Sequence, residues 1–187
     1  SPLRIEPKCR YFSECGGCQY QHLNPSFVAD QKVAHVRDAL ERIAGEKIPI
    51  SPLVSPDAVW NYRNRLTYHR SPTGEAGYVS WKDYRVIDVE DCPIGHIELN
   101  QLWTRLREKT RSIPAEILPY VVLRRTTTGQ IAVIFSTTKT INVPTMEGAF
   151  TYETRIKVGS HSPFGKSIET LSGPDWLTEE IAGIRYL

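Results

Sequence analysis

The stretch Cys9-Arg-Tyr-Phe-Ser-Glu-Cys15-Gly-Gly-Cys18-Gln-Tyr-Gln-His22 contains three of the four cysteines of this 187-residue chain. The fourth, Cys92, stands far downstream and is followed by Pro93. Three thiolates this close in sequence reach one centre only if the backbone curls tightly, and Gly16 and Gly17 are free to adopt positive φ between the last two. The pattern predicts a metal-binding loop whose ligands are Cys9, Cys15, Cys18 and Cys92.

The spacing of these cysteines favours an iron–sulfur cluster over a zinc ion. Structural zinc usually takes its ligands in two close pairs, whereas here three are local and one is remote. A [4Fe-4S] cluster takes four cysteine thiolates, and a remote ligand followed by proline, as in Cys92-Pro93, occurs in ferredoxins. Zinc, disulfides and free thiols remain alternatives, although disulfides need an oxidising compartment for which the sequence gives no argument.

The composition is that of an ordinary globular protein, with 40% hydrophobic and 24% charged residues. The 23 basic and 21 acidic residues leave a formal charge of +2, so any contact with nucleic acid must come from local clustering. No apolar run approaches the ~20 residues that cross a bilayer, and no signal-peptide pattern is present. We therefore expect a cytoplasmic protein that does not act at a membrane.

The first half of the chain predicts one helix, a linker and an antiparallel meander. Asn24-Pro25 supplies an N-cap and a first-turn proline, and Gly45 ends the helical run. The apolar positions at helical spacing are Val33, Val36, Leu40 and Ile43. Three prolines in the segment Ile48–Pro56 indicate a linker. The predicted strands of the meander are Tyr62–His69, Glu75–Trp81 and Arg85–Val89.

A second helix and more strands are predicted after Cys92. The apolar stripe of this helix is Ile97 or Leu99, Leu102, Trp103 and Leu106, and Pro114 prevents its continuation. The predicted strands that follow are a hairpin of Ile117–Arg125 with Gln130–Ser136, then Phe150–Val158 and Ser167–Leu171. The fold class is therefore α+β, an antiparallel β-sheet with a few helices packed on it and a cysteine-rich loop.

Basic and aromatic residues mix in two places that suit single-stranded RNA. Arg63 and Arg65 lie two residues apart, and so on one face of a strand, within Asn61–Arg70. Unpaired bases stack on aromatic or guanidinium planes, and Trp81–Arg85 is a second such mixture. The alternative is an ordinary solvated strand with surface arginines, because short clusters of aromatic and basic residues are common without RNA binding. The candidate RNA contacts are Tyr62, Arg63, Arg65, Tyr68, Arg70, Lys82 and Arg85, with Arg124, Arg125 and Lys166 as weaker candidates.

No motif for an independent active site is present in the sequence. It contains no nucleotide-binding loop, paired carboxylates or zinc-protease motif, so we expect no catalytic residue in this chain. If all four cysteines bind a cluster, none of them is available as a nucleophile.

In their order, these motifs resemble the iron–sulfur type of SAM-dependent RNA (uracil-5-)methyltransferases. The resemblance rests on the cysteine stretch, Gln31-Lys32 on a helix, Asn61–Arg65 and Ile87–Pro93. It continues more weakly into Leu171–Leu177 and Ile184–Leu187, which resemble the entry to the catalytic domain of that family.

The resemblance implies an RNA-recognition and [4Fe-4S]-binding part of an enzyme that methylates C5 of uridine in rRNA or tRNA. It implies a cluster-binding loop at 1–23, a helix and linker at 24–52, and a central RNA-recognition domain at 53–187. It also implies that SAM and the catalytic cysteine belong to a domain beyond Leu187 and that this fragment alone is inactive. The helix at 24–44 would then lack its usual cover and could drive self-association.

In such an enzyme the cluster is expected to be structural, because methyl transfer from SAM involves no net electron transfer. Its contribution is to tie the loop at Cys9–Cys18 to the sheet edge at Cys92. The alternative is an iron–sulfur electron carrier or a radical-SAM accessory domain without an RNA substrate. A radical-SAM cluster uses three cysteines, whereas this chain supplies four.

Overall fold

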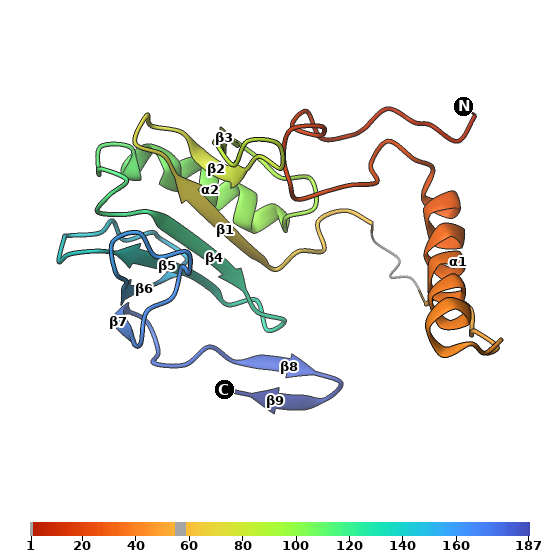
Figure 1. Ribbon diagram of the computed structural model, residues 1–187. Helices are drawn as coiled ribbons and strands as arrows, with labels where there is room; N and C mark the ends of the chain where they lie inside the picture. Colours follow the sequence, from red (N-terminus) through yellow and green to blue (C-terminus); the bar gives the residue numbers. More distant parts are fainter. Residues whose placement is uncertain (1, 55–58) are drawn as a thin grey trace.

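A seven-stranded sheet forms the centre of the computed structural model, which describes residues 2–54 and 59–187 (Figure 1). Within this described part the strand order is β3-β2-β1-β4-β5-β6-β7, and every neighbouring pair is antiparallel except β5–β6. The strands are β1 (Arg65–Arg70), β2 (Ala76–Val79), β3 (Val86–Asp88), β4 (Tyr120–Arg125), β5 (Ile131–Thr137), β6 (Phe150–Arg155) and β7 (Ile168–Ser172). The predicted α+β class is confirmed, but the described sheet is mostly rather than wholly antiparallel, and of the two described helices only α2 packs on it as predicted.

The parallel pairing of β5 with β6 was not predicted. Parallel neighbours need a crossover of about a dozen residues or more, and residues 138–149 supply it. Val143 and Met146 anchor this crossover because both side chains are buried in the core. Strand patterns report which residues alternate but not the direction in which strands pair, so this parallel pair could not be predicted from them.

Helix α2 (Ile97–Thr110) packs on the sheet as predicted. Its buried apolar residues are Leu99, Leu102, Trp103 and Leu106, whereas Ile97 is 54% exposed. These side chains meet the core face of the sheet, which includes Leu66 and Phe135. The helix ends at Thr110, before Pro114.

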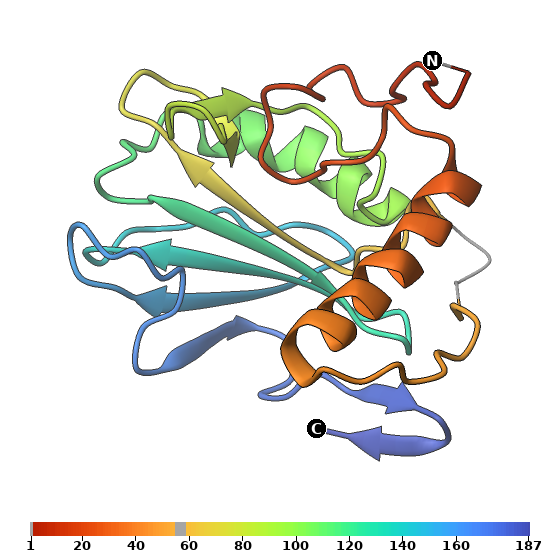
Figure 2. The same cartoon turned by 45° about the vertical axis from the view of Figure 1, so that its right-hand side comes forward.

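Helix α1 (Pro25–Ala44) stands apart from the sheet in Figure 1 and comes to the front in the turned view of Figure 2. The predicted caps are confirmed: Asn24 Oδ1 accepts a hydrogen bond from the Ser26 amide at 3.0 Å, and Gly45 ends the helix at φ 71°. No residue of α1 is buried, and Val36 and Ile43 are 51% and 87% exposed. Val33 and Leu40 are half-buried, so the apolar face of α1 is only partly covered. Neither described helix is both long and apolar enough to cross a membrane.

One connection agrees with its prediction as far as the structure describes it, and one hairpin was not predicted. The predicted linker Ile48–Pro56 has neither helix nor strand through residue 54, and its last two residues lie outside the described part. Near the end of the chain, β8 (Glu179–Ile181) and β9 (Ile184–Tyr186) form a hairpin that was not predicted. Its turn places Ala182 and Gly183 at positive φ, and alanine is not a residue that signals such a turn.

Close packing of β2 against β3 depends on Gly77. A Cβ atom at this position would lie 2.1 Å from the Ile87 carbonyl oxygen and 2.7 Å from the Val89 nitrogen. We expect Gly77→Ala to lower the free energy of unfolding by about 1–3 kcal/mol, because both neighbours are backbone atoms that cannot move independently. Urea denaturation measures this loss.

A second glycine separates steric overlap from backbone strain. Gly129, in the β4–β5 hairpin, has φ 86°, and an added Cβ would meet no atom within 4 Å. Gly129→Ala tests conformational strain alone, for which we expect the smaller loss, about 1 kcal/mol. A Gly77→Ala protein as stable as the unsubstituted chain would contradict the packing argument.

Candidate functional site

The four cysteines line one small cavity, which we call the cysteine cavity. Cys9, Cys15 and Cys18 belong to the N-terminal loop, and Cys92 follows β3. None of the four is in a disulfide, and Cys92 is buried at 8% exposure. Thus the fold brings the four predicted ligands together, although Cys92 is remote in sequence from the other three.

The cavity does not have the form of a closed single-ion site. The described residues contain no group of three or more His, Cys, Asp or Glu side chains that could hold a metal ion as they stand. A zinc ion holds its sulfur ligands about 2.3 Å from one centre. A [4Fe-4S] cluster places iron and sulfide between the thiolates, so its ligands stand further apart. The cluster itself remains a prediction.

Gly16 allows close approach of the backbone, and the loop does not use the freedom to adopt positive φ that was expected of Gly16 and Gly17. Ser13, at φ 76°, is the left-handed residue of this loop, and neither glycine has positive φ. The Gly16 amide donates to the Val79 carbonyl at 3.1 Å, and a Cβ on Gly16 would lie 3.2 Å from that oxygen. The loop therefore lies directly against β2.

Further contacts fix the cysteine loop to the β2–β3 edge. Cys15 forms an isolated antiparallel bridge with Ser80, and the Trp81 indole N–H donates to the Ser13 carbonyl at 2.9 Å. Arg85 forms an ion pair with Glu14 across the same boundary. The loop and the sheet edge are thus joined by polypeptide contacts as well as by the shared cavity.

Helix α2 positions Cys92 from the other side. The Cys92 amide donates to Asn100 Oδ1 at 3.0 Å, and Asn100 Nδ2 returns a bond to the Cys92 carbonyl at 2.9 Å. Before Cys92, the Val89 carbonyl accepts a hydrogen bond from Trp103 Nε1 at 2.8 Å. The two Asn100 bonds fix the backbone on both sides of the Cys92 thiol, and the Trp103 bond fixes the segment that leads to it.

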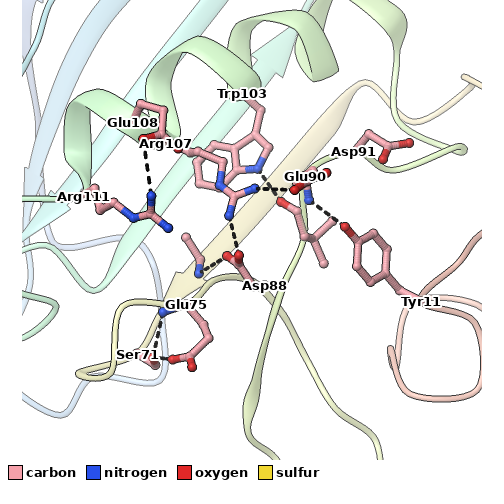
Figure 3. A network of polar contacts seen from close by, with 12 residues as sticks. Tyr11, Ser71, Glu75, Asp88, Glu90, Asp91, Trp103, Arg107, Glu108 and Arg111 are labelled. Atoms are coloured by element: carbon pink, nitrogen blue, oxygen red, sulfur yellow. Dashed lines mark hydrogen bonds and ion pairs between the residues drawn. The ribbon is translucent and has the colours of Figure 1, made fainter.

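Figure 3 shows the acidic segment that precedes Cys92 between α2 and the loop. Arg107 forms an ion pair with Asp88 and lies 3.8 Å from Glu90, while the Glu90 amide donates to the Tyr11 hydroxyl at 3.0 Å. Arg10 adds an ion pair to Glu90. The segment is therefore bridged to both elements that supply or support the cysteines.

The strand that was predicted to begin at Tyr62 begins only at Arg65, because the preceding residues pair with the Cys92 segment. Asn61 and Arg63 donate their amides to the Pro93 and Ile94 carbonyls at 3.0 and 2.8 Å. Asn61 has φ 55°, which turns the chain at this point. As a result Arg63 lines the cysteine cavity.

Burial favours the neutral form of two of the four thiols. It is the largest cause of the raised pKa of Cys9 and of Cys15. Against it, a hydrogen bond from the Gly17 amide and the charge of Arg63 lower the pKa of Cys15. Thiolates are the form that binds metal, so occupation of the cavity must be coupled to release of these protons.

The predicted RNA contacts divide into buried and exposed residues. Tyr68 has 0% exposure and stacks on Trp103 with ring centroids 3.7 Å apart, and Arg70 is 8% exposed. The prediction that Tyr68 and Arg70 contact RNA is therefore wrong for this fold, because alternate residues of β1, these two among them, face the core. Arg85 is exposed but paired with Glu14 and Asp83.

Three predicted contacts are open to solvent. Tyr62 is 57% exposed, Arg65 lies over the Phe164 ring at 5.2 Å, and Lys82 lies over the Trp81 ring at 5.5 Å. The weaker candidates Arg124 and Arg125 are paired with Glu179 and Glu98. Trp81 and Tyr84 belong to the predicted mixture at Trp81–Arg85 but were not among the candidate contacts, and their rings are 62% and 82% exposed beside Lys82.

No family model matches the chain, but curated proteins do. It is 39% identical over 113 residues to an uncharacterized RNA methyltransferase of Synechocystis, covering 58% of this chain and 24% of the relative. It is 30% identical over 140 residues to the 23S rRNA (uracil(1939)-C(5))-methyltransferase RlmD of Erwinia tasmaniensis, a match that covers 72% of this chain and 32% of the relative. The tRNA (uracil(54)-C(5))-methyltransferase of Pyrococcus abyssi is 27% identical over 199 residues, and the match covers 100% of this chain and 47% of the relative.

The fold is shared with a solved structure. The crystal structure of the Pyrococcus abyssi tRNA (uracil-54, C5)-methyltransferase in complex with S-adenosyl-L-homocysteine matches 100% of this chain and 45% of that chain, with a TM-score of 0.72 and 24% identity. The chain spans less than half the length of these relatives. It is thus related to RNA methyltransferases, among them enzymes named for C5 of uracil in rRNA and in tRNA.

Proposed function

We propose that this chain is the RNA-recognition and cluster-binding part of a SAM-dependent RNA uracil C5-methyltransferase. The observation that carries the proposal is the convergence of Cys9, Cys15, Cys18 and Cys92 on one cavity, in a chain related to such enzymes. In this proposal SAM and the catalytic nucleophile belong to another part of the enzyme, and the present fold contributes recognition of the RNA.

The residues of the cysteine cavity fit a [4Fe-4S] cluster. Four cysteine thiolates are the ligand set that such a cluster takes, and they surround one space without forming a single-ion site. Two buried donors that line the cavity, Gln21 Nε2 and Tyr78 Oη, have no hydrogen-bond partner among the described residues. When bound, the cluster would cross-link the N-terminal loop to the segment after β3.

The proposed RNA-binding surface consists of Tyr62, Arg65, Trp81, Lys82 and Tyr84. The Trp81 indole is held by its bond to the Ser13 carbonyl, so its exposed ring is oriented for stacking on a base. Stacking on aromatic rings together with backbone contacts from basic side chains is how proteins hold single-stranded RNA. The substrate class that fits is an unpaired RNA segment containing a uridine.

We expect the double variant Arg65→Ala/Lys82→Ala to bind RNA more weakly and with a lower salt dependence. Each lost phosphate contact lowers the slope of log affinity against log salt by about 0.7 for a single strand, so the double variant should lose up to about 1.4. Fluorescence anisotropy with a labelled uridine-containing RNA at several salt concentrations measures both quantities.

A matched control removes the same charge elsewhere. Lys109→Ala/Arg111→Ala takes two cations from the C-terminal end of α2, outside the proposed surface. We expect its affinity and slope to stay near those of the unsubstituted chain. Equal losses in the two double variants would indicate a nonspecific charge effect and contradict the proposed surface.

A further inference from the structure

Two side-chain donors at the cysteine cavity have no partner in the polypeptide. Gln21 Nε2 and Tyr78 Oη are both buried, line the cavity and make no hydrogen bond within the described part of the chain. Folded proteins keep few such groups, because a donor taken from water without a new acceptor destabilises the fold. An acceptor inside the cavity would account for both.

Gln21 is oriented with its donor free. The Cys9 amide donates to Gln21 Oε1 at 3.0 Å, which identifies the oxygen of the side-chain amide and leaves Nε2 without an acceptor. Reversing the amide would place two donors face to face at Cys9. The free N–H group therefore belongs to the Cys9 side of the cavity.

Tyr78 belongs to the Cys92 side. Its ring stacks on Tyr68 with centroids 5.2 Å apart, and Tyr68 stacks in turn on Trp103, so the hydroxyl is held by an aromatic column from the core. Tyr78 and Cys92 line the same cavity, and the phenolic O–H of a tyrosine is a hydrogen-bond donor.

We propose that Tyr78 and Gln21 donate hydrogen bonds to sulfur atoms of the bound [4Fe-4S] cluster, Tyr78 near Cys92 and Gln21 near Cys9. This inference rests on the proposed function. Sulfur of a thiolate-bound cluster is an anionic acceptor, and hydrogen bonds to it are one of the factors that set the reduction potential. Such a bond stabilises the more negative, reduced cluster and so raises the potential.

The test compares Tyr78→Phe with Tyr152→Phe in anaerobically reconstituted protein. Tyr152 is also buried, but it lies on β6 and its hydroxyl donates to the Pro174 carbonyl at 2.7 Å. We expect the midpoint potential, from titration followed by electron paramagnetic resonance, to become more negative in Tyr78→Phe and to stay unchanged in Tyr152→Phe. Gln21→Glu, which keeps the acceptor for the Cys9 amide but removes the donor, should also shift it negative.

The protein without a cluster supplies an independent readout with the opposite pattern. Tyr78→Phe removes a hydroxyl that has no partner in the polypeptide, so the thermal midpoint should not fall. Tyr152→Phe breaks a hydrogen bond and should lower it. If Tyr78 had only a structural role, Tyr78→Phe would lower the thermal midpoint of the protein without a cluster and leave the potential of the loaded protein unchanged.

Iron and sulfide analysis of the unsubstituted chain comes first, because it distinguishes failure of the proposed cluster-binding function from failure of the proposed hydrogen bonds. Without a cluster in that protein, the cluster-binding function and this inference both fall. With a loaded cluster, an unchanged potential in Tyr78→Phe overturns the inference and leaves the proposed function standing. Loss of cluster from Tyr78→Phe, with an unchanged thermal midpoint before loading, would support it.

Discussion

Cys92→Ser is expected to remove iron and sulfide from the anaerobically purified protein as completely as Cys15→Ser. The reason is geometric, because both thiols line one cavity although they are far apart in sequence. The unsubstituted chain should contain about four irons and a matching amount of labile sulfide, and each serine variant little of either. Iron and sulfide determination with the visible absorption spectrum measures this loss.

A neighbouring residue provides the control for local disturbance. Asp91 also lines the cavity but supplies no thiol, and it lies 3.3 Å from Arg10 at the rim. Asp91→Asn keeps the shape of this side chain and should retain the cluster. Stoichiometric zinc without labile sulfide in the unsubstituted protein, or a full complement of iron in Cys92→Ser, would contradict the assignment.

Local signals in the sequence were enough to predict both helices. Asn24 and Gly45 mark the ends of α1 because capping depends on the residues at the ends themselves. The apolar stripe of α2 is equally local, and the structure buries it as predicted. Cysteine spacing indicated a common centre for the same reason, although only the fold shows how Cys92 arrives there.

Other features depend on contacts between distant segments. Alternation in the predicted strand Tyr62–His69 placed Arg63 and Arg65 on one face but could not say which face of the strand meets α2. Tyr68 and Arg70 were therefore wrongly assigned to RNA. The pairing of residues 61–63 with the Cys92 segment depends on a segment distant in sequence, and it carries Arg63 to the cavity. Partners such as Glu14 for Arg85 are likewise set by tertiary structure.

Trp103→Ala is expected to lower the free energy of unfolding by about 3–5 kcal/mol, because its large side chain is 0% exposed at the centre of the core. The ring stacks on Tyr68 at an interplanar angle of 3°, and its indole N–H donates to the Val89 carbonyl at 2.8 Å. Truncation therefore leaves a cavity and an unpaired acceptor together. Denaturant unfolding of the protein before cluster loading measures this loss.

Two further variants show how this core position supports the cysteine cavity. Trp176 is 70% exposed, so Trp176→Ala should change stability by no more than about 0.5 kcal/mol. Trp103→Phe keeps much of the packing but removes the donor, and leaving the Val89 carbonyl unpaired should cost about 1–3 kcal/mol. A loss in Trp103→Ala no larger than that in Trp176→Ala would contradict this role. Because Val89 lies three residues before Cys92, Trp103→Phe should also lose its cluster faster to a chelator than the unsubstituted chain.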